Sequence, residues 1–228
     1  MKREEEEGVM ADRIKHMVDI IADMSLKSGY SLYQVFTDWV QCTAIGIQNA
    51  SCLLRSNVWE SREKRYLDVY NRYSINRFPE LTALLAEELE EDMSDVLGHL
   101  FMSGGMGSGV TGQFFTPFHL SYLTASLIDI EKAKAEPVIV MNEPSIGGGG
   151  MVIAMAKVLH EHGINYQKKL RVIGQDLDHS VLYMAYIQLS LLGIDAVLVQ
   201  GDTLREPYRA GYPLERTYRT PRNMGVLL

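Results

Sequence analysis

The sequence predicts an α/β protein in which a helical N-terminal region precedes a partial parallel sheet of three or four strands. Three observations support this prediction: apolar positions recur at helical spacing through the first hundred residues, short apolar runs follow residue 136, and stretches of helical spacing separate those runs. Strands that alternate with helices form a parallel sheet with helices across its faces. We place the boundary of the two regions at a glycine-rich loop, which gives residues 1–103 and 104–228.

The N-terminal region is expected to consist of helices. In the first of them Ile14, Met17 and Ile21 share one face. Ser31 is a suitable N-cap for the second helix, and Pro79 is a suitable first-turn residue for the fourth. The predicted helices span about 11–27, 31–55, 60–72, 79–89 and 95–102. Because glycines cannot hold a helix, residues 103–109 are expected to form a loop or a domain hinge.

The second region alternates strands and helices. Short apolar runs predict strands at 137–141, 170–174 and 196–199, and the apolar end of the chain, 224–228, is expected to be a fourth strand. Helical spacing predicts helices at about 117–130, 151–162 and 178–192. The strand-helix-strand order is typical of parallel sheets, in which the crossover connections are helices.

Composition indicates an ordinary globular protein, with 46% hydrophobic and 22% charged residues. No apolar run is long enough for a membrane span, and the charged N-terminus lacks the apolar segment of a secretion signal, so we expect a cytoplasmic protein. Cys42 and Cys52 lie ten positions apart in one predicted helix and cannot form a disulfide there. No cysteine or histidine cluster has the spacing of metal ligands.

The formal net charge of −7 argues mildly against DNA binding by this chain alone, because DNA-binding proteins usually present a basic face. The segment 205–222 is locally basic, however, and contains five arginines against two glutamates. Two interpretations stay open for it: a solvated surface, or a contact to DNA.

The first strand of the sheet is followed by a glycine-rich segment, residues 142–150, which leads into a helix. Glycines at such a turn let a ligand approach the backbone closely, although a tight turn requires them as well. In open α/β sheets, ligands bind beyond the C-terminal ends of the strands. Position and composition together therefore predict a ligand-binding loop.

The next two strands also end in polar residues. The carboxylate of Asp176 could accept both hydroxyls of a ribose; alternatively, Asp176 or Asp178 caps the following helix. After the third strand, Asp202 and Thr203 could meet the edge of an adenine, or they could form a simple turn.

A further candidate segment, residues 112–117, precedes the helix at 117–130. Thr116 could cap this helix with Pro117 at its first position, and the exposed helix end could hold a carboxylate. The adjacent Phe114 and Phe115 could pack against a ligand or into the core.

Taken in order, four motifs resemble those of the N6-adenine DNA methyltransferases, especially the modification subunits of type I restriction systems. They read Gln-Phe-Phe-Thr-Pro, Glu-Pro-Ser-x-Gly-x-Gly-Gly, Gly-Gln-Asp and Gly-Asp-Thr-Leu, and the resemblance covers about residues 95–204. It implies a Rossmann-like sheet, S-adenosylmethionine as cofactor, and methyl transfer to adenine N6 in DNA.

The resemblance also implies roles for single residues. The methionine end of the cofactor would lie against Phe115, Thr116 and Pro117. Asp176 would bind the ribose hydroxyls, and Asp202 would face the adenine amino group. The remaining predicted cofactor-binding residues are Glu143, Pro144, Ser145, Gly147 and Gly149 around the methionine and ribose, and Leu204 beside the adenine ring.

Two features depart from the family's pattern. The family's loop usually reads Asp-Pro-x-Cys-Gly-Ser-Gly, whereas Glu143, Ile146 and Gly148 stand here in place of Asp, Cys and Ser. The sequence also contains no Asn/Asp-Pro-Pro-Phe/Tyr tetrapeptide, the family motif that holds the target adenine. We expect that motif to begin where the predicted fourth strand ends, at the end of this sequence, so the chain resembles a truncated methyltransferase whose catalytic residues are unknown.

Three functional interpretations follow. The chain is a methyltransferase that works with unusual catalytic residues or with residues borrowed from a partner chain, a cofactor-binding regulatory or defence-related protein without catalysis, or a structural protein with an empty loop. Because the missing strands would leave a sheet edge open, we also expect self-association or a partner protein that covers this edge.

Overall fold

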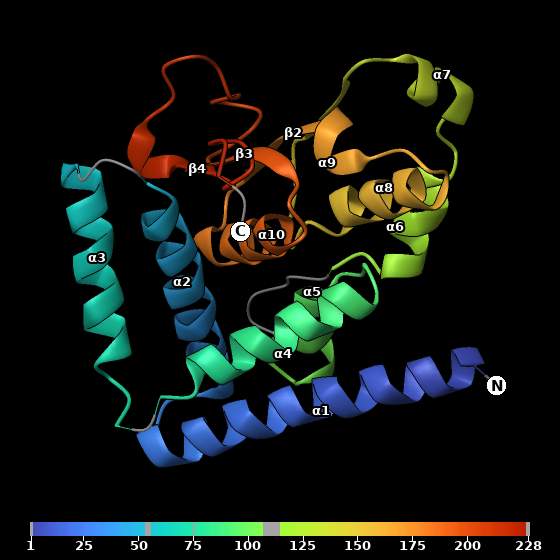
Figure 1. The fold of residues 1–228 in the computed structure, drawn as a ribbon. Helices are drawn as coiled ribbons and strands as arrows, with labels where there is room; N and C mark the ends of the chain where they lie inside the picture. Colours follow the sequence, from blue (N-terminus) through green and yellow to red (C-terminus); the bar gives the residue numbers. More distant parts are fainter. Residues whose placement is uncertain (1, 53–55, 75, 107–114, 227–228) are drawn as a thin grey trace.

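The computed structural model describes residues 2–52, 56–74, 76–106 and 115–226, and of residues 2–11 only the backbone. The N-terminal part consists of helices, as the sequence predicts (Figure 1). They are α1 (Lys2–Ser28), α2 (Leu32–Ser51), α3 (Asn57–Tyr70), α4 (Phe78–Glu91) and α5 (Val96–Ser103). Ser31 caps α2, since its hydroxyl accepts the N–H of Gln34 at 3.2 Å.

The second part contains the sheet and its covering helices. Its elements are α6 (Phe118–Ala125), α7 (Ile130–Ala135), β1 (Ile139–Glu143), α8 (Gly150–Glu161), α9 (Tyr166–Lys169), β2 (Leu170–Asp176), α10 (His179–Leu191), β3 (Asp195–Gln200), a 3₁₀ turn (Leu214–Arg216) and β4 (Thr217–Arg219). The strand order is β1-β2-β3-β4. Strands β1, β2 and β3 are parallel, and β4 is antiparallel to β3. The predicted α/β class with a partial parallel sheet is confirmed.

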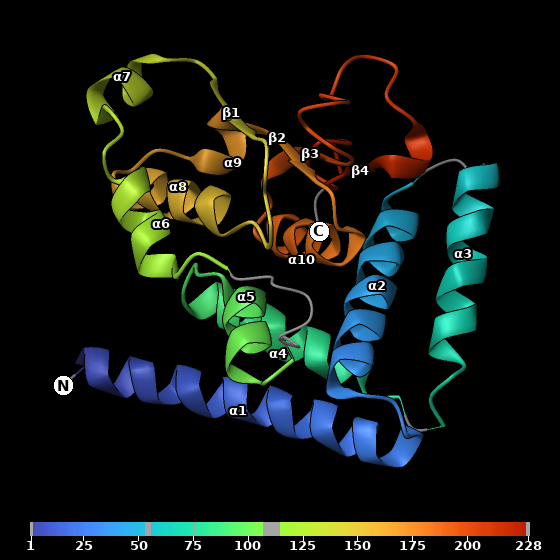
Figure 2. The same cartoon turned by 180° about the vertical axis from the view of Figure 1, so that it is seen from behind.

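Helices α8 and α10 lie between the sheet and the N-terminal helices (Figures 1 and 2). Both connect neighbouring parallel strands in the same direction along the sheet, and right-handed crossovers then place them on the same face. Leu170, Val172 and Leu198 are fully or almost fully buried. The side chains of the central strands therefore belong to the core that this helical layer covers.

The first strand forms an edge of the sheet within the described residues, because it pairs with β2 alone. Its backbone groups on the other side are unpaired there, and the side chain of Val140 is 69% exposed. The open edge expected from the sequence is therefore present in the part of the chain that the structure describes. An apolar side chain on an unpaired parallel strand is typical of a surface that another segment covers.

The hydrophobic core is continuous from the N-terminal helices to the helices under the sheet. Phe36 packs edge-on against Trp39 and Phe101, with ring centroids 5.8 and 5.6 Å apart. Trp39 is fully buried, and its indole N–H donates to the Thr82 hydroxyl at 3.0 Å. One core contains residues from both sides of residue 103. The domain boundary placed there stays a prediction.

Two predicted elements are wrong. Residues 224–226 form no strand, and Leu227 and Leu228 lie outside the described residues; the fourth strand is instead β4. The helix expected at 117–130 ends at Ala125, and a separate helix, α7, begins at Ile130, where Asp129 caps it by accepting the N–H of Lys132 at 3.0 Å. The short helix α9 is absent from the elements that the sequence predicts. In the predicted loop 103–109, residues 107–109 lie outside the described residues.

Cys42 and Cys52 are free thiols. Among the described helices, none combines the length and the apolar composition that crossing a membrane requires.

Candidate functional site

The glycine-rich segment after β1 forms a tight turn that leads into α8. Gly147 and Gly149 have φ angles of 53° and 94°, in the left-handed region that favours glycine. Ile146 is buried, and its N–H donates to the Gln175 carbonyl at 3.0 Å. The Gly149 N–H donates to the Ile146 carbonyl at 2.9 Å. The turn is therefore fixed to the end of β2 through the backbone of Ile146.

Asp176, the last residue of β2, lies directly against this turn. Its Oδ2 accepts the N–H of Gly147 at 2.9 Å, and its Oδ1 accepts the N–H of Asp178 at 3.1 Å. The helix cap is Asp178, whose Oδ1 accepts the N–H of Ser180 at 2.7 Å. Of the two alternatives that the sequence leaves open for the cap, Asp178 is the residue that caps α10, and Asp176 belongs to the glycine turn.

A cavity of about 350 Å³ lies beside Asp176 and the turn. Five of the predicted cofactor-binding residues line it: Phe115, Thr116, Ser145, Gly147 and Asp176. Ser121, on α6, also lines it; its side chain is almost completely buried, and its hydroxyl has no hydrogen-bond partner among the described residues. Buried hydroxyls are usually paired, so this one is available to a bound group.

The segment before α6 differs from the prediction in one detail. Helix α6 begins at Phe118, Pro117 takes the cap position with ψ of 131°, and neither Thr116 nor Pro117 gives a side-chain cap. Helical geometry is disfavoured for the residue before a proline, which explains why Thr116 does not start the helix. Gly112, Gln113 and Phe114 of the predicted motif lie outside the described residues.

Phe115 lies between the two parts of the molecule. Its ring meets Phe101 edge-on at a centroid distance of 5.4 Å. On its other side, the ring lies 3.7 Å from the position that a β-carbon on Gly147 would take. The aromatic side chain therefore contacts both the core and the wall of the cavity.

The other predicted cofactor-binding residues do not line this cavity. Burial raises the pKa of Glu143, whose Oε1 accepts the N–H of Ser145 at 3.4 Å. Asp202 accepts the N–H of Leu204 at 2.9 Å and pairs with Arg205, while the Leu204 side chain is 94% exposed. The remaining three are Pro117, Pro144 and Gly149.

The loop after β3 nevertheless reaches the glycine turn. The Thr203 hydroxyl donates to the carbonyl of Pro144 at 2.6 Å. The segments that follow the first and third strands are therefore joined by a direct hydrogen bond.

The sequence reasoning missed a buried polar cluster under the turn. Asp95 caps α5, and its Oδ1 accepts the N–H of Gly98 at 3.0 Å and the side-chain amide of Gln188 at 2.9 Å. The same amide donates to the Gly148 carbonyl at 2.8 Å, and the Gln188 oxygen accepts the N–H of Leu97. Burial raises the pKa of Asp95. An aspartate before an apolar run and a glutamine inside an apolar helix were the available signals.

The basic segment makes contacts within the chain. Arg216 pairs with Glu206 at 3.0 Å, and Arg222 donates to the Gln167 carbonyl at 3.1 Å. The side chain of Arg205 extends into solvent, where it pairs with Asp202 at 3.5 Å. Part of the positive charge in residues 205–222 is thus balanced locally.

One prediction concerns how closely the turn packs on the sheet. A β-carbon on Gly174 would overlap Cδ1 of Ile146 and lie 2.7 Å from Cδ2 of Leu198. We expect Gly174→Ala to lower the free energy of unfolding by about 1–3 kcal/mol in urea denaturation, because all three residues lie in the packed core. In an Ile146→Val background, which lacks Cδ1, the same substitution should be less destabilising; an equal loss in both backgrounds would contradict the proposed clash.

Comparison with known proteins identifies the family of this chain. Residues 91–217 match the model of the N-6 DNA methylase family, and this match covers more than half of the chain. The chain belongs to the N-6 DNA methylase family. No curated protein matches it.

The solved structures that are similar to this one include two methyltransferases. The first, from Listeria monocytogenes, is assigned to the class I S-adenosylmethionine-dependent methyltransferases; it has a TM-score of 0.47 and 13% identity over 86% of this chain and 54% of its own. The second is the methyltransferase subunit of a type I restriction-modification system from Streptococcus thermophilus, with a TM-score of 0.44 and 16% identity over 86% of this chain and 45% of its own. The present chain spans about half the length of each.

Proposed function

We propose that the cavity beside Asp176 binds S-adenosylmethionine, and that the chain is the cofactor-binding half of an adenine-N6 DNA methyltransferase. The observation that carries the proposal is the hydrogen bond from Gly147 N–H to Asp176, which joins the glycine turn to a carboxylate in one cavity. A carboxylate at this position accepts ribose hydroxyls in nucleotide-binding α/β proteins.

The residues around the cavity fit such a cofactor. The volume lies within the range of small-molecule sites, about 300–1,000 Å³. Asp176 would accept the ribose hydroxyls, the ring of Phe115 would cover the methionine chain, and Ser121 supplies an unpaired hydroxyl. Asp202 and Leu204 remain proposed contacts of the adenine end. When bound, the cofactor would supply an electrophilic methyl group.

The acceptor would be the amino group of an adenine in DNA, as the family's description implies. Transfer to nitrogen depends mainly on holding the two groups in position. The sequence has no Asn/Asp-Pro-Pro-Phe/Tyr motif to hold the base, and the outer edge of β1 is unpaired in the described residues. We therefore propose that a partner segment pairs with this edge and completes the site, and that the basic segment 205–222 or the partner contacts DNA.

The test is calorimetric titration of the protein with S-adenosylmethionine and with S-adenosylhomocysteine. We expect saturable binding of both at about micromolar strength, since both contain the ribose and the methionine chain that the cavity would hold. No binding of either compound would remove the cofactor assignment.

A second candidate function is a cofactor-binding protein without catalysis, which the net charge of −7 favours because it disfavours contact with DNA. Both functions require cofactor binding, so transfer of a labelled methyl group to DNA separates them. Transfer that is lost in Asp202→Ala supports the enzyme, whereas binding without transfer to any DNA, alone or with the partner subunit, supports the second function.

A further inference from the structure

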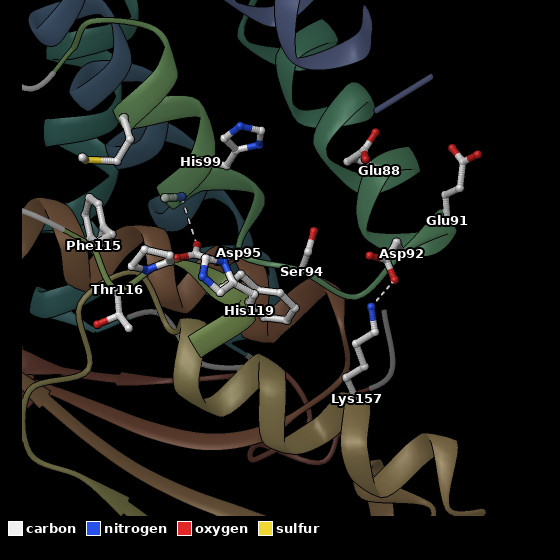
Figure 3. A pocket seen from close by; sticks show the side chains of 14 residues that line it. Glu88, Glu91, Asp92, Ser94, Asp95, His99, Phe115, Thr116, His119 and Lys157 are labelled. Carbon is white, nitrogen blue, oxygen red and sulfur yellow. Dashed lines mark hydrogen bonds and ion pairs between the residues drawn. The ribbon is translucent and has the colours of Figure 1, made fainter. Parts of the chain in front are cut away.

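A second, larger cavity of about 770 Å³ lies where the N-terminal helices face α6 and α8 (Figure 3). Residues of α4 and α5 line one side of it, and residues of α6 and α8 line the other. It shares Asp95, Phe115 and Thr116 with the proposed cofactor cavity, and its other lining residues are its own. The proposed methyltransferase function does not account for it.

Carboxylates outnumber cations in the lining of this cavity. Glu88, Glu91, Asp92 and Asp95 contribute carboxyl groups, Lys157 contributes an ammonium group, and His99 and His119 contribute imidazoles. From α1, Arg13 pairs with Glu88 and, at 2.8 Å, with Glu91, and Lys157 pairs with Asp92, whereas no cation of the described residues pairs with Asp95. Such a surface repels phosphates and attracts cations.

Lys157 shows which kind of cation this cavity can accommodate. Its ammonium group pairs with Asp92 (Figure 3). It also lies 5.8 Å from the centre of the Phe118 ring. An ammonium group over an aromatic face gains electrostatic stabilisation in addition to its ion pair. An alkylammonium group of the protein itself therefore already occupies one side of the cavity.

Ser94 gives independent evidence of a ligand. The residue is 5% exposed, and its hydroxyl has no hydrogen-bond partner among the described residues. Figure 3 shows this hydroxyl directed into the cavity, in the space between His99 and Asp92. A primary ammonium group brings three N–H donors, of which one could bond to this hydroxyl and another to a carboxylate.

We propose that this cavity binds a small organic cation with primary ammonium groups, of which a linear diamine is the simplest. The described residues include no group of three or more side chains that could hold a metal ion, and the cavity is far larger than a bare ion. The diamine places one ammonium group beside Asp92 and Ser94, and its alkyl chain lies between the apolar side chains of Met102 on α5 and Phe118 on α6.

The test is calorimetric titration of the whole chain with cadaverine, 1,5-diaminopentane, at low ionic strength. Lys157→Met should tighten binding about fivefold or more, because it removes the internal ammonium group that competes for Asp92. Ser94→Ala should weaken binding about fivefold to tenfold, because the guest loses an acceptor. Lys64→Met, which removes an exposed lysine outside the cavity lining, is the matched control and should change nothing.

Two further titrations show whether the site selects for the ammonium groups of the diamine. Pentane-1,5-diol, which has the same length without charge, should not bind, and MgCl₂ should not compete with cadaverine beyond its effect on ionic strength. The proposal is overturned if neither the wild type nor Lys157→Met binds cadaverine, if the two bind it equally, or if Mg²⁺ binds with the same dependence on Ser94. Because Asp176 is not in this lining, Asp176→Ala should leave cadaverine binding unchanged, which separates this site from the cofactor site.

Discussion

Replacing Asp176 with alanine is expected to weaken S-adenosylhomocysteine binding about a hundredfold or more. The substitution removes the proposed acceptor of the ribose hydroxyls, and hydrogen bonds to a charged group contribute about 1.5–3 kcal/mol each. It also removes the acceptor of the Gly147 N–H, which helps hold the turn in place. Calorimetric titration measures the combined effect, and circular dichroism checks that the variant is folded.

The two roles of Asp176 can be separated with a modified ligand. The 2′-deoxy analogue of S-adenosylhomocysteine lacks one hydroxyl, so the wild type should bind it less tightly than the parent compound. In Asp176→Ala the two ligands should bind equally, because the acceptor is gone. If the variant lowers the affinity for both ligands by the same factor, Asp176 only positions the loop. Asp178→Asn is the matched control, since Asp178 caps α10 and does not line the cavity.

The parts of this fold that could be predicted are those whose signal is local. The three parallel strands contain short runs of mainly apolar residues, and each begins within two residues of its predicted position. The strand β4 has three residues and pairs antiparallel with β3, a contact that no periodicity in the segment 205–222 indicates. Arginines around it led to a surface interpretation, although Tyr218 and Thr220 within that segment are buried.

The candidate site was predictable where a motif and a strand end coincide. Gly147 and Asp176 both lie at such points, and the structure joins them by a hydrogen bond. Asp95 and Gln188 were not predicted, because their contact spans 93 positions in the sequence and depends on how α5 packs on α10. Each residue type is a local signal by itself, but a single sequence does not show that two residues so far apart are paired.

The second large effect is expected for Asp95→Ala, which should lower the free energy of unfolding by about 2–4 kcal/mol. Asp95→Ala removes the N-cap of α5, worth about 1 kcal/mol, and leaves the buried amide of Gln188 with one acceptor fewer, at a further cost of about 1–3 kcal/mol. Urea denaturation measures the loss. The matched control is Asp129→Ala, which removes only the exposed cap of α7 and should cost about 1 kcal/mol.

The pH dependence of stability gives Asp95 a separate signature. Burial raises the pKa of this carboxyl, so the folded protein keeps its proton to a higher pH than the unfolded chain does. Its contribution to stability is present below the unfolded pKa, falls as the pH rises toward the folded pKa, and is constant above it. Asp95→Asn keeps an acceptor oxygen for Gly98 and Gln188 but carries no charge, so its stability relative to the wild type should increase across this window and then level off.

The opposite pH dependence of Asp95→Asn would show which interaction dominates at this carboxyl. If Asp95→Asn loses stability relative to the wild type as the pH rises, the carboxylate is stabilised in its charged form, and the hydrogen bonds from Gln188 and Gly98 outweigh burial. Because Gln188 also holds the Gly148 carbonyl, Asp95→Ala should additionally weaken S-adenosylhomocysteine binding, whereas Asp129→Ala should not. The buried pair then connects the packing of the N-terminal helices to the geometry of the glycine turn.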